Sequence, residues 1–124
     1  MIRFYLAFYM AKLARFILKV LGTNGTHVPG KVALAICPNF LKYIAKPEKI
    51  IVVTGTNGKT TVSNLLSDCL QKAGQKVINN RMGGNIASGV CVCLLQGTGF
   101  FNKSKADIAV IEMDERSSLK VLPY

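Results

Sequence analysis

The sequence predicts an α/β fold, a parallel sheet with helices on both faces, preceded by a short helical extension at the N-terminus. Three short runs predict strands: a β-branched run at 49–54, typical of a strand buried on both faces, a second strand at 77–79, and a further buried strand at 108–111. Two segments of helical character separate them, at 59–73 and 87–96. Because parallel strands are joined by long crossovers, usually helices, this alternation predicts a parallel sheet.

Residues 1–48 are predicted to form the basic helical extension, and residues 49–124 the first part of the α/β domain. Helical periodicity covers residues 4–21, and a stretch rich in Gly, Thr and Asn ends it. An apolar stretch at 31–37 and a short helix capped by Asn39 complete the extension.

The chain is strongly basic, with 16 Lys and Arg residues against 6 Asp and Glu residues and a formal net charge of +10. Such an excess favours polyanions or anionic lipid surfaces as partners. Nucleic acid is not expected, because the sequence has no zinc finger, no RNP motif and no aromatic residues interleaved with arginine. The four cysteines form no Cys-x-x-Cys pair, and we expect free thiols in the core of a cytoplasmic protein.

Residues 1–21 superficially resemble a membrane anchor. A spanning helix needs about 20 apolar residues, whereas Lys12 interrupts this run, and Lys12 and Arg15 would each cost roughly 3 kcal/mol near the bilayer centre. Spanning is therefore rejected. Together with Lys19, these cations recur at helical spacing on an otherwise apolar segment, which is typical of an amphipathic helix. Packing against the domain is the favoured interpretation, and peripheral contact with the inner face of the cell membrane is the alternative.

A candidate phosphate-binding loop joins the first strand to the following helix. It reads Thr54-Gly55-Thr56-Asn57-Gly58-Lys59-Thr60-Thr61. Glycines let the backbone turn tightly and approach an oxyanion, and the amides that follow can point inward at the positive end of the helix dipole. Lys59 supplies a mobile charge for the terminal phosphates. Thr60 places a hydroxyl where Mg²⁺ would bind between them.

Phosphoryl chemistry also needs a carboxylate to hold the metal, commonly at the end of a neighbouring strand. In a parallel sheet that end lies at the same edge as the phosphate loop, and Glu112 follows the third strand there. Asp107 begins that strand and would lie roughly 16 Å away at about 3.3 Å per residue, so distance excludes it. Glu112 is therefore the predicted metal ligand beside Thr60, and Asp114 is the alternative.

A polar, glycine-rich loop follows the second strand and reaches the same edge of the sheet. Its candidate residues are Asn80, Arg81 and Asn85. This position predicts contact with a substrate or with the terminal phosphate. A plain connection between strand and helix is the alternative.

The phosphate loop is a shortened variant, since Val53 stands where the usual Walker pattern has its first glycine. In this form it resembles the ATP-binding central domain of the Mur ligases and folylpolyglutamate synthases. More of the chain is similar to the MurT family, the ligase subunits of glutamine-hydrolysing lipid II isoglutaminyl synthases. The similar segments lie at 14–16, 29–34, 80–85, 88–89 and 112–115.

The resemblance implies a specific reaction. MurT-like subunits use ATP to activate the α-carboxylate of D-glutamate in the lipid II stem peptide as an acyl phosphate. Ammonia from a GatD-type glutaminase partner then displaces the phosphate and leaves D-isoglutamine. The resemblance further implies that Lys59 binds the β- and γ-phosphates in catalysis, that Thr60 and Glu112 hold Mg²⁺, and that the backbone of Thr56 to Thr61 cradles the phosphates.

The chain also departs from the family pattern. Its cysteines match neither the position nor the spacing of the four-cysteine zinc ribbon that such proteins often carry, and the GatD-binding surface is expected beyond Tyr124. We therefore expect an N-terminal fragment or a truncated gene product, inactive as a ligase on its own. Two alternatives remain open: another Mur or folylpolyglutamate-type ligase, and a non-catalytic basic module that binds anionic lipid or nucleic acid.

Overall fold

The computed structural model describes residues 1–23, 27–81 and 86–124. Within these ranges the chain forms helices and strands in an order that matches the predicted alternation. The elements are α1 (Ile2–Val20), α2 (Val28–Ile36), α3 (Phe40–Tyr43), β1 (Lys49–Val53), α4 (Lys59–Lys72), β2 (Val77–Asn79), α5 (Ala87–Gln96), β3 (Ile108–Glu112) and α6 (Glu115–Val121).

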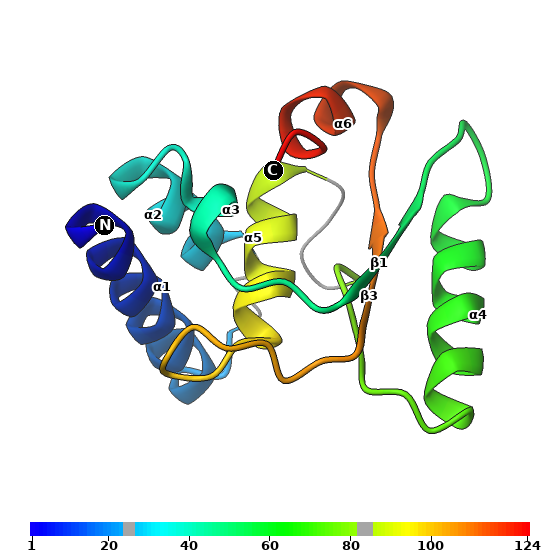
Figure 1. The fold of residues 1–124 in the computed structure, drawn as a ribbon, viewed down its shortest axis with the longest axis horizontal. Coiled ribbons are helices and arrows are strands. Elements are labelled where there is room, and N and C mark those ends of the chain that lie inside the picture. Colours follow the sequence, from blue (N-terminus) through cyan, green and yellow to red (C-terminus); the bar gives the residue numbers. More distant parts are fainter. Residues whose placement is uncertain (24–26, 82–85) are drawn as a thin grey trace.

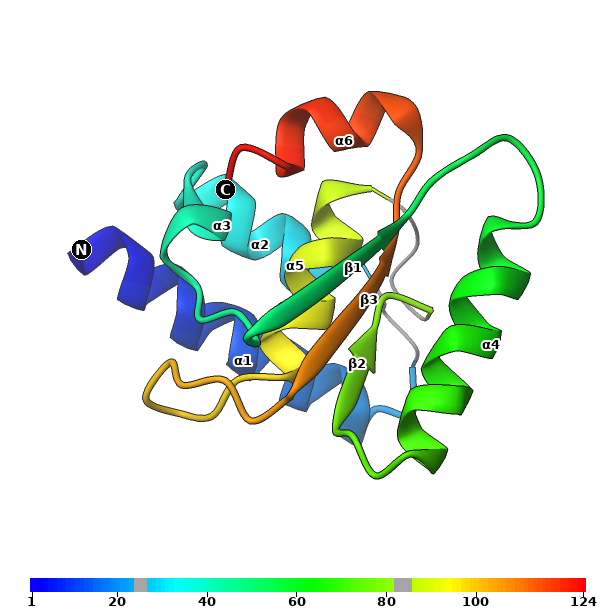
Figure 2. The ribbon, with the colours of Figure 1, turned by 45° about the vertical axis from the view of Figure 1, so that its right-hand side comes forward.

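The three strands form a parallel sheet in the order β1-β3-β2, which places the last strand in the centre (Figure 2). Val53 pairs with Glu112 in the register of β1 and β3, and Val77 pairs with Ile108 in the register of β2 and β3. All three strands therefore end at the same edge of the sheet. The predicted parallel sheet is confirmed.

The prediction that β1 is buried on both faces is wrong. Lys49 and Ile50 are exposed and the rest of β1 is half-buried, whereas β3 is buried from Ile108 to Ile111. The strand order explains the difference in burial, because β1 is an outer strand of the described sheet while β3 has a neighbouring strand on each side. A β-branched run favours a strand, but it does not show where in the sheet that strand lies.

Helices cover both faces of the sheet, as predicted. Figure 1 shows α4 on one face and α5 on the other. Beyond α5 the N-terminal helices add a further layer, since α2 packs against α5 and α1 packs against α2. Gly30 marks a close approach of α2 to α5, because a Cβ atom there would lie 2.0 Å from the carbonyl oxygen of Ser88 in α5.

One hydrophobic core joins the N-terminal helices to the α/β part. The inner face of α1 contributes Phe4, Ala7, Phe8 and Ala11, which are buried. The same cluster contains residues of α2, α3, α5 and β3, among them Ala33, Phe40, Val90, Leu95 and Ile111. The favoured interpretation of residues 1–21, a helix packed on the domain, therefore agrees with the structure. The domain boundary near residue 48 stays a prediction.

Two smaller expectations need correction. Asn39 precedes α3 as predicted, but its side chain makes no capping hydrogen bond to that helix. Cys37, Cys91 and Cys93 are buried free thiols, whereas Cys69 is exposed on α4.

Within the described part of the chain, no helix combines the length and the apolarity that crossing a membrane requires.

Candidate nucleotide-binding site

The candidate phosphate loop lies at the carboxyl edge of the sheet, between the end of β1 and the start of α4 (Figure 2). The carbonyl of Val53 accepts a hydrogen bond of 3.0 Å from the amide of Met113, so β1 and β3 reach this edge together. Residues 54–58 are exposed, and Lys59 is the first residue of α4. The sequence prediction of a strand-loop-helix connection is confirmed.

Two glycines give the loop its backbone conformation. Gly55 has a φ of +142° and Gly58 a φ of +76°, which residues with a Cβ atom rarely adopt. A Cβ atom at either position would meet nothing within 4 Å. Conformation therefore favours glycine at both positions, and the space beside them is open to a ligand.

The N-terminus of α4 faces this open loop. Gly58 occupies the N-cap position, no described side chain caps the helix there, and its first turn contains no acidic residue. The first amides of an α-helix have no partner within the helix and carry a partial positive charge. Lys59, the first residue of α4, adds a positive charge at this end of the helix, so the position is suited to an anion.

Thr60 and Glu112 meet directly at the edge of the sheet. The Thr60 hydroxyl lies 2.9 Å from each carboxylate oxygen of Glu112, a geometry in which its one hydrogen is shared between the two acceptors. The two residues are separated by 52 positions in the sequence, and the parallel register of β1 and β3 brings them together. The sequence predicted that Thr60 and Glu112 lie together at the carboxyl ends of the strands, and the structure confirms that the two side chains are close.

Asn80 fixes the backbone of Glu112. Its side-chain oxygen accepts a hydrogen bond of 2.8 Å from the amide of Glu112, and its side-chain nitrogen donates one of 2.7 Å to the carbonyl of Glu112. Asn80 is buried and directly follows β2. Its amide therefore continues the pairing of β2 with β3 beyond the last backbone pair, and it holds Glu112 at the point where the carboxylate meets Thr60.

Asp114, the alternative metal ligand, has a structural role. It is the N-cap of α6 and accepts a hydrogen bond of 2.6 Å from the amide of Ser117. Hydrogen bonds from Ser117 lower the pKa of Asp114, and the charges of Lys59 and Arg116 lower it further. Asp114 thus lies within electrostatic range of the loop lysine, but its carboxylate is already engaged in capping α6.

Asp107 lies at the opposite end of the strands, just before β3 begins. This agrees with the prediction that it is too far from the phosphate loop to hold a metal there. Its carboxylate accepts a hydrogen bond of 2.9 Å from the amide of Lys76, just before β2 begins. This contact fixes the start of β2 beside the start of β3. Asp107 is therefore remote from the phosphate loop.

Arg81 lies against α4. Its Nε donates to the side-chain oxygen of Asn64 at 2.7 Å, and its guanidinium lies 3.4 Å from the carboxylate of Asp68. Of the three predicted substrate-loop residues, Asn80 and Arg81 therefore make contacts within the chain, and Asn85 lies outside the described residues. Contact between this loop and a substrate stays a prediction.

Sequence reasoning missed the residues that position this site. Asn80 was predicted to meet a substrate, and the pairing of its amide with the backbone of Glu112 was not foreseen. No local sequence signal identified this pairing, because it depends on β2 lying beside β3 and its partner Glu112 is 32 positions away. Asn64 and Asp68 were also missed, although their spacing of four residues places them on one face of α4.

Comparison with known proteins shows which family this region matches. The Mur ligase middle domain matches residues 53–121, from the end of β1 to the end of α6. That range contains the whole phosphate loop, Asn80 and Glu112.

Individual relatives extend the match to the N-terminal helices. The MurT subunit of the glutamine-hydrolysing lipid II isoglutaminyl synthase of Staphylococcus aureus is 38% identical over 122 residues, which are 97% of this chain and 27% of that protein. The MurT subunit of Streptococcus pneumoniae is 38% identical over 111 residues, which are 90% of this chain and 24% of that protein.

A further relative is a ligase with a different name. The UDP-N-acetylmuramoylalanine--D-glutamate ligase of Desulfosudis oleivorans is 38% identical over 97 residues, which are 77% of this chain and 17% of that protein. The chain thus spans about a quarter, or less, of the length of these relatives. On the match of residues 53–121 and the parallel α/β architecture, the chain belongs to the Mur ligase middle-domain family.

Proposed function

We propose that the loop at 54–61 binds the terminal phosphates of ATP. The backbone amides at the start of α4 would contact the phosphate oxygens, and Lys59 would bind the β- and γ-phosphates. Family membership supports this proposal, because the matched region is a Mur ligase middle domain and contains the loop. The observation that carries it is the open, glycine-shaped loop at an α4 N-terminus that no described side chain caps.

The proposal includes Mg²⁺ held by Thr60 and Glu112. A hydroxyl and a carboxylate are hard oxygen ligands of the kind that Mg²⁺ prefers. The two side chains already converge at 2.9 Å beside Lys59, so the donor set fits the ion. Bound there, Mg²⁺ would neutralise charge on the terminal phosphates. Asn80 would keep Glu112 in place through its two hydrogen bonds to the Glu112 backbone.

We propose that the whole reaction is that of a MurT-like amide ligase. With a GatD-type glutaminase it would amidate the α-carboxylate of D-glutamate in the lipid II stem peptide to D-isoglutamine through an acyl phosphate. The 38% identity over 97% of this chain to the MurT subunit of S. aureus supports this reaction over others of the superfamily. This chain would supply the phosphate-binding portion of that enzyme, since it corresponds to only 27% of that relative.

A second candidate is an ATP-dependent D-glutamate ligase. It is favoured by the 38% identity over 97 residues to the ligase of D. oleivorans. The two candidates differ in their nitrogen source, because the name of the MurT subunit includes glutamine hydrolysis and that of the other ligase does not. A requirement for a glutaminase subunit therefore separates them.

The test is an amidation assay on the polypeptide that contains this chain, supplied with ATP, Mg²⁺, glutamine, a GatD-type subunit and lipid II. We expect glutamine-dependent formation of D-isoglutamine, measured by mass spectrometry of the stem peptide. Lys59→Ala should abolish this product, whereas Lys72→Ala, at the far end of α4, should leave it unchanged. Product formation that survives in Lys59→Ala would contradict the role of Lys59. Ligation of D-glutamate without a glutaminase would favour the second candidate.

A further inference from the structure

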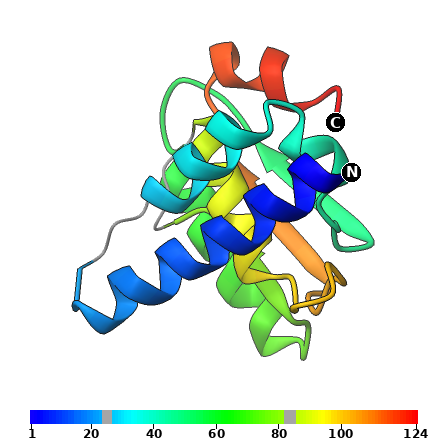
Figure 3. The ribbon, with the colours of Figure 1, turned by 90° about the vertical axis from the view of Figure 1, so that its left-hand side faces the viewer.

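The outer face of α1 carries a stripe of exposed apolar side chains. Its residues recur every three or four positions, so they share one face of the helix. They are Ile2, Leu6, Tyr9, Leu13, Phe16 and Val20. The buried face of α1, with Phe4 and Phe8, is occupied by the core described above. Figure 3 shows α1 on the outside of the molecule, so the stripe faces solvent.

The segment at 99–105 extends this apolar face. Phe100 and Phe101 are 73% and 83% exposed. The hydroxyl of Tyr9 donates a hydrogen bond of 3.1 Å to the carbonyl of Phe100, which holds the segment against α1. A groove of about 450 Å³ lies between them, and its lining includes Leu13, Phe16 and Phe100. Two segments about 90 residues apart thus form one surface.

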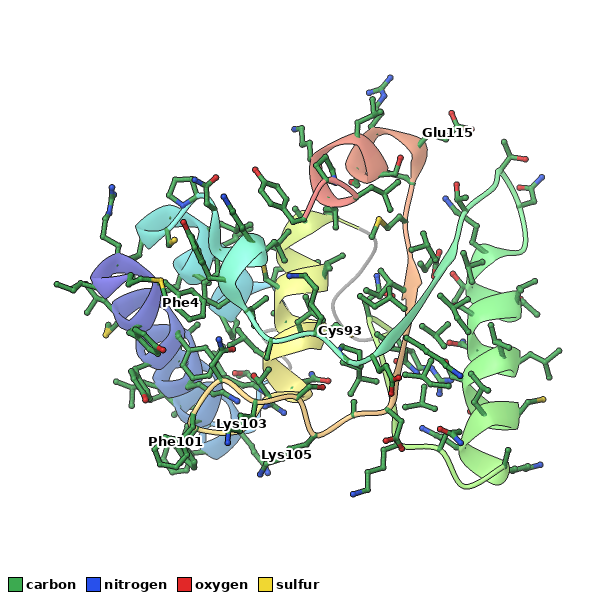
Figure 4. All side chains as sticks on the ribbon, viewed as in Figure 1. Phe4, Cys93, Phe101, Lys103, Lys105 and Glu115 are labelled. Carbon is green, nitrogen blue, oxygen red and sulfur yellow. The ribbon has the colours of Figure 1, made fainter. Side chains whose placement is uncertain are left out.

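Cations surround this surface. Arg15 and Lys19 line the groove beside the apolar side chains. Lys103 and Lys105 lie in the second segment, which the hydrogen bond from Tyr9 holds against the middle of α1, and Figure 4 labels both lysines together with Phe101. The sequence has no acidic residue in 1–47 or in 97–106. The apolar stripe of α1, residues 99–105 and these four cations together form one surface, the docking surface.

Lys12 also lines the groove, but the chain itself engages its ammonium group, so it is not counted among the four cations of the docking surface. Its ammonium group donates hydrogen bonds to the carbonyls of Leu95 and Thr98 and lies 5.4 Å from the centre of the Phe8 ring. Lys12 therefore joins α1 to the end of α5. The charge available to a partner comes from Arg15, Lys19 and the lysines of 99–105.

The chemistry of the docking surface limits its occupant. An apolar protein surface would bury four cations without acidic partners, which is costly. A second copy of the chain would bring the same positive charges together. Nucleic acid would satisfy the charge but would gain nothing from exposed Leu, Ile and Val side chains. An anionic lipid surface offers both partners, phosphate head groups for the cations and the acyl boundary for the apolar side chains.

We propose that the docking surface binds the surface of an anionic lipid membrane. α1 would lie in the plane of the interface, with its apolar stripe at the acyl boundary and its cations among the head groups. A helix of 19 residues is about 28 Å long at 1.5 Å per residue, which provides an extended contact. In Figures 1 and 2 the phosphate loop lies on the far side of α5 and the sheet from α1, so docking leaves that loop accessible.

The test measures binding of the chain to lipid vesicles by co-sedimentation. Vesicles of pure phosphatidylcholine are compared with vesicles that contain phosphatidylglycerol, at low and at high salt. We expect binding to the anionic vesicles that weakens as salt rises, because the Debye length shortens from about 10 Å at 0.1 M to about 3 Å at 1 M. The double variant Arg15→Glu/Lys19→Glu should lower the partition coefficient at least about tenfold.

Matched controls separate the docking surface from general charge and hydrophobicity. Lys19 and Lys72 are both exposed and both lie in the last turn of a helix, so Lys72→Glu controls for Lys19→Glu. Phe16 and Leu65 are both 64% exposed, so Leu65→Ser controls for Phe16→Ser. We expect only the α1 variants to lose binding, and circular dichroism should show that all four variants remain folded.

Several outcomes would overturn the proposal. These are an absence of binding to anionic vesicles, equal binding to neutral vesicles, and equal losses in the α1 variants and their controls. A chain that forms dimers sensitive to Phe16→Ser, without binding vesicles, would instead assign the surface to a second copy. Preferential binding of a nucleic acid over anionic vesicles, with the same sensitivity to Lys19→Glu, would assign it to that polyanion.

Discussion

Two asparagine side chains bind backbone groups in the same way at different places in the molecule. Asn80 pairs with the amide and carbonyl of Glu112 at the phosphate edge. Asn102 accepts from the amide of Ala45 at 2.8 Å and donates to the carbonyl of Tyr43 at 2.9 Å, far from that edge. The pair offers a controlled comparison between a stabilising contact and a contact that also positions a functional carboxylate.

We predict that Asn80→Ala and Asn102→Ala each lower the free energy of unfolding by about 1–3 kcal/mol, because each leaves backbone groups without their side-chain partner. Only Asn80→Ala should also weaken binding of a Mg²⁺-nucleotide, since only Asn80 positions Glu112. Urea unfolding and nucleotide titration measure the two effects. Equal nucleotide affinity in both variants would show that Asn80 has a structural role alone.

Lys12 links stability to pH at the residue scale. Burial lowers the pKa of Lys12 from 10.5 to about 8, with Arg15 and Lys105 adding charge repulsion. Below about pH 8 the lysine is charged in both the folded and the unfolded chain, and the cost of burying the charge is fully present. Between about pH 8 and 10.5 the unfolded chain binds more protons, so stability rises with pH in this window.

We predict that the free energy of unfolding of the wild type rises relative to that of Lys12→Met as the pH goes from 8 to 10.5. Below pH 8 the difference between the two should stay constant. Because Lys12 is only half-buried, solvent screening keeps this rise small. Urea unfolding at a series of pH values provides the measurement, and parallel curves over the whole range would contradict the account of Lys12.

At the scale of elements, the contact between α2 and α5 depends on one missing side chain. A Cβ atom at Gly30 would overlap the backbone of Ser88, which cannot move as a flexible side chain would. We predict that Gly30→Ala lowers the free energy of unfolding by about 1–3 kcal/mol, in spite of the better helix propensity of alanine. Lys31→Ala, at the next and exposed position of α2, is the control and should change stability little.

One outcome would contradict the prediction for Gly30→Ala. If Gly30→Ala stabilises the chain, α2 and α5 are farther apart than the structure places them. Thermal unfolding of both variants, in the same buffer, decides between the two results.

Local sequence signals predicted most elements well. β-branched runs and the phosphate-loop glycines, both of which have a positive φ, are features of a few adjacent residues. The exposure of β1 was not predictable in this way, because strand order depends on how distant segments pair. The same limit applies to Asn80, whose partner Glu112 lies 32 positions away, and to Lys12, whose partners lie more than 80 positions away.

At the scale of the whole molecule, the fold separates the two surfaces for which functions are proposed. The proposed phosphate site lies at the carboxyl edge of the sheet beside α4, and the proposed docking surface lies on the outer face of α1 (Figure 1). A layer of α2 and α5 stands between α1 and the sheet. This arrangement would let one face contact an anionic membrane while the other receives the nucleotide.

The central claim is that the loop at 54–61 holds the terminal phosphates of ATP with the help of Lys59. Isothermal titration of the chain with a non-hydrolysable ATP analogue and Mg²⁺ tests it most directly. We predict that Lys59→Ala lowers the affinity about 10- to 100-fold, the effect of removing one charge-assisted contact to a phosphate. Lys72→Ala, on the same helix, should bind as the wild type does. An affinity for the analogue that Lys59→Ala leaves unchanged would contradict the claim.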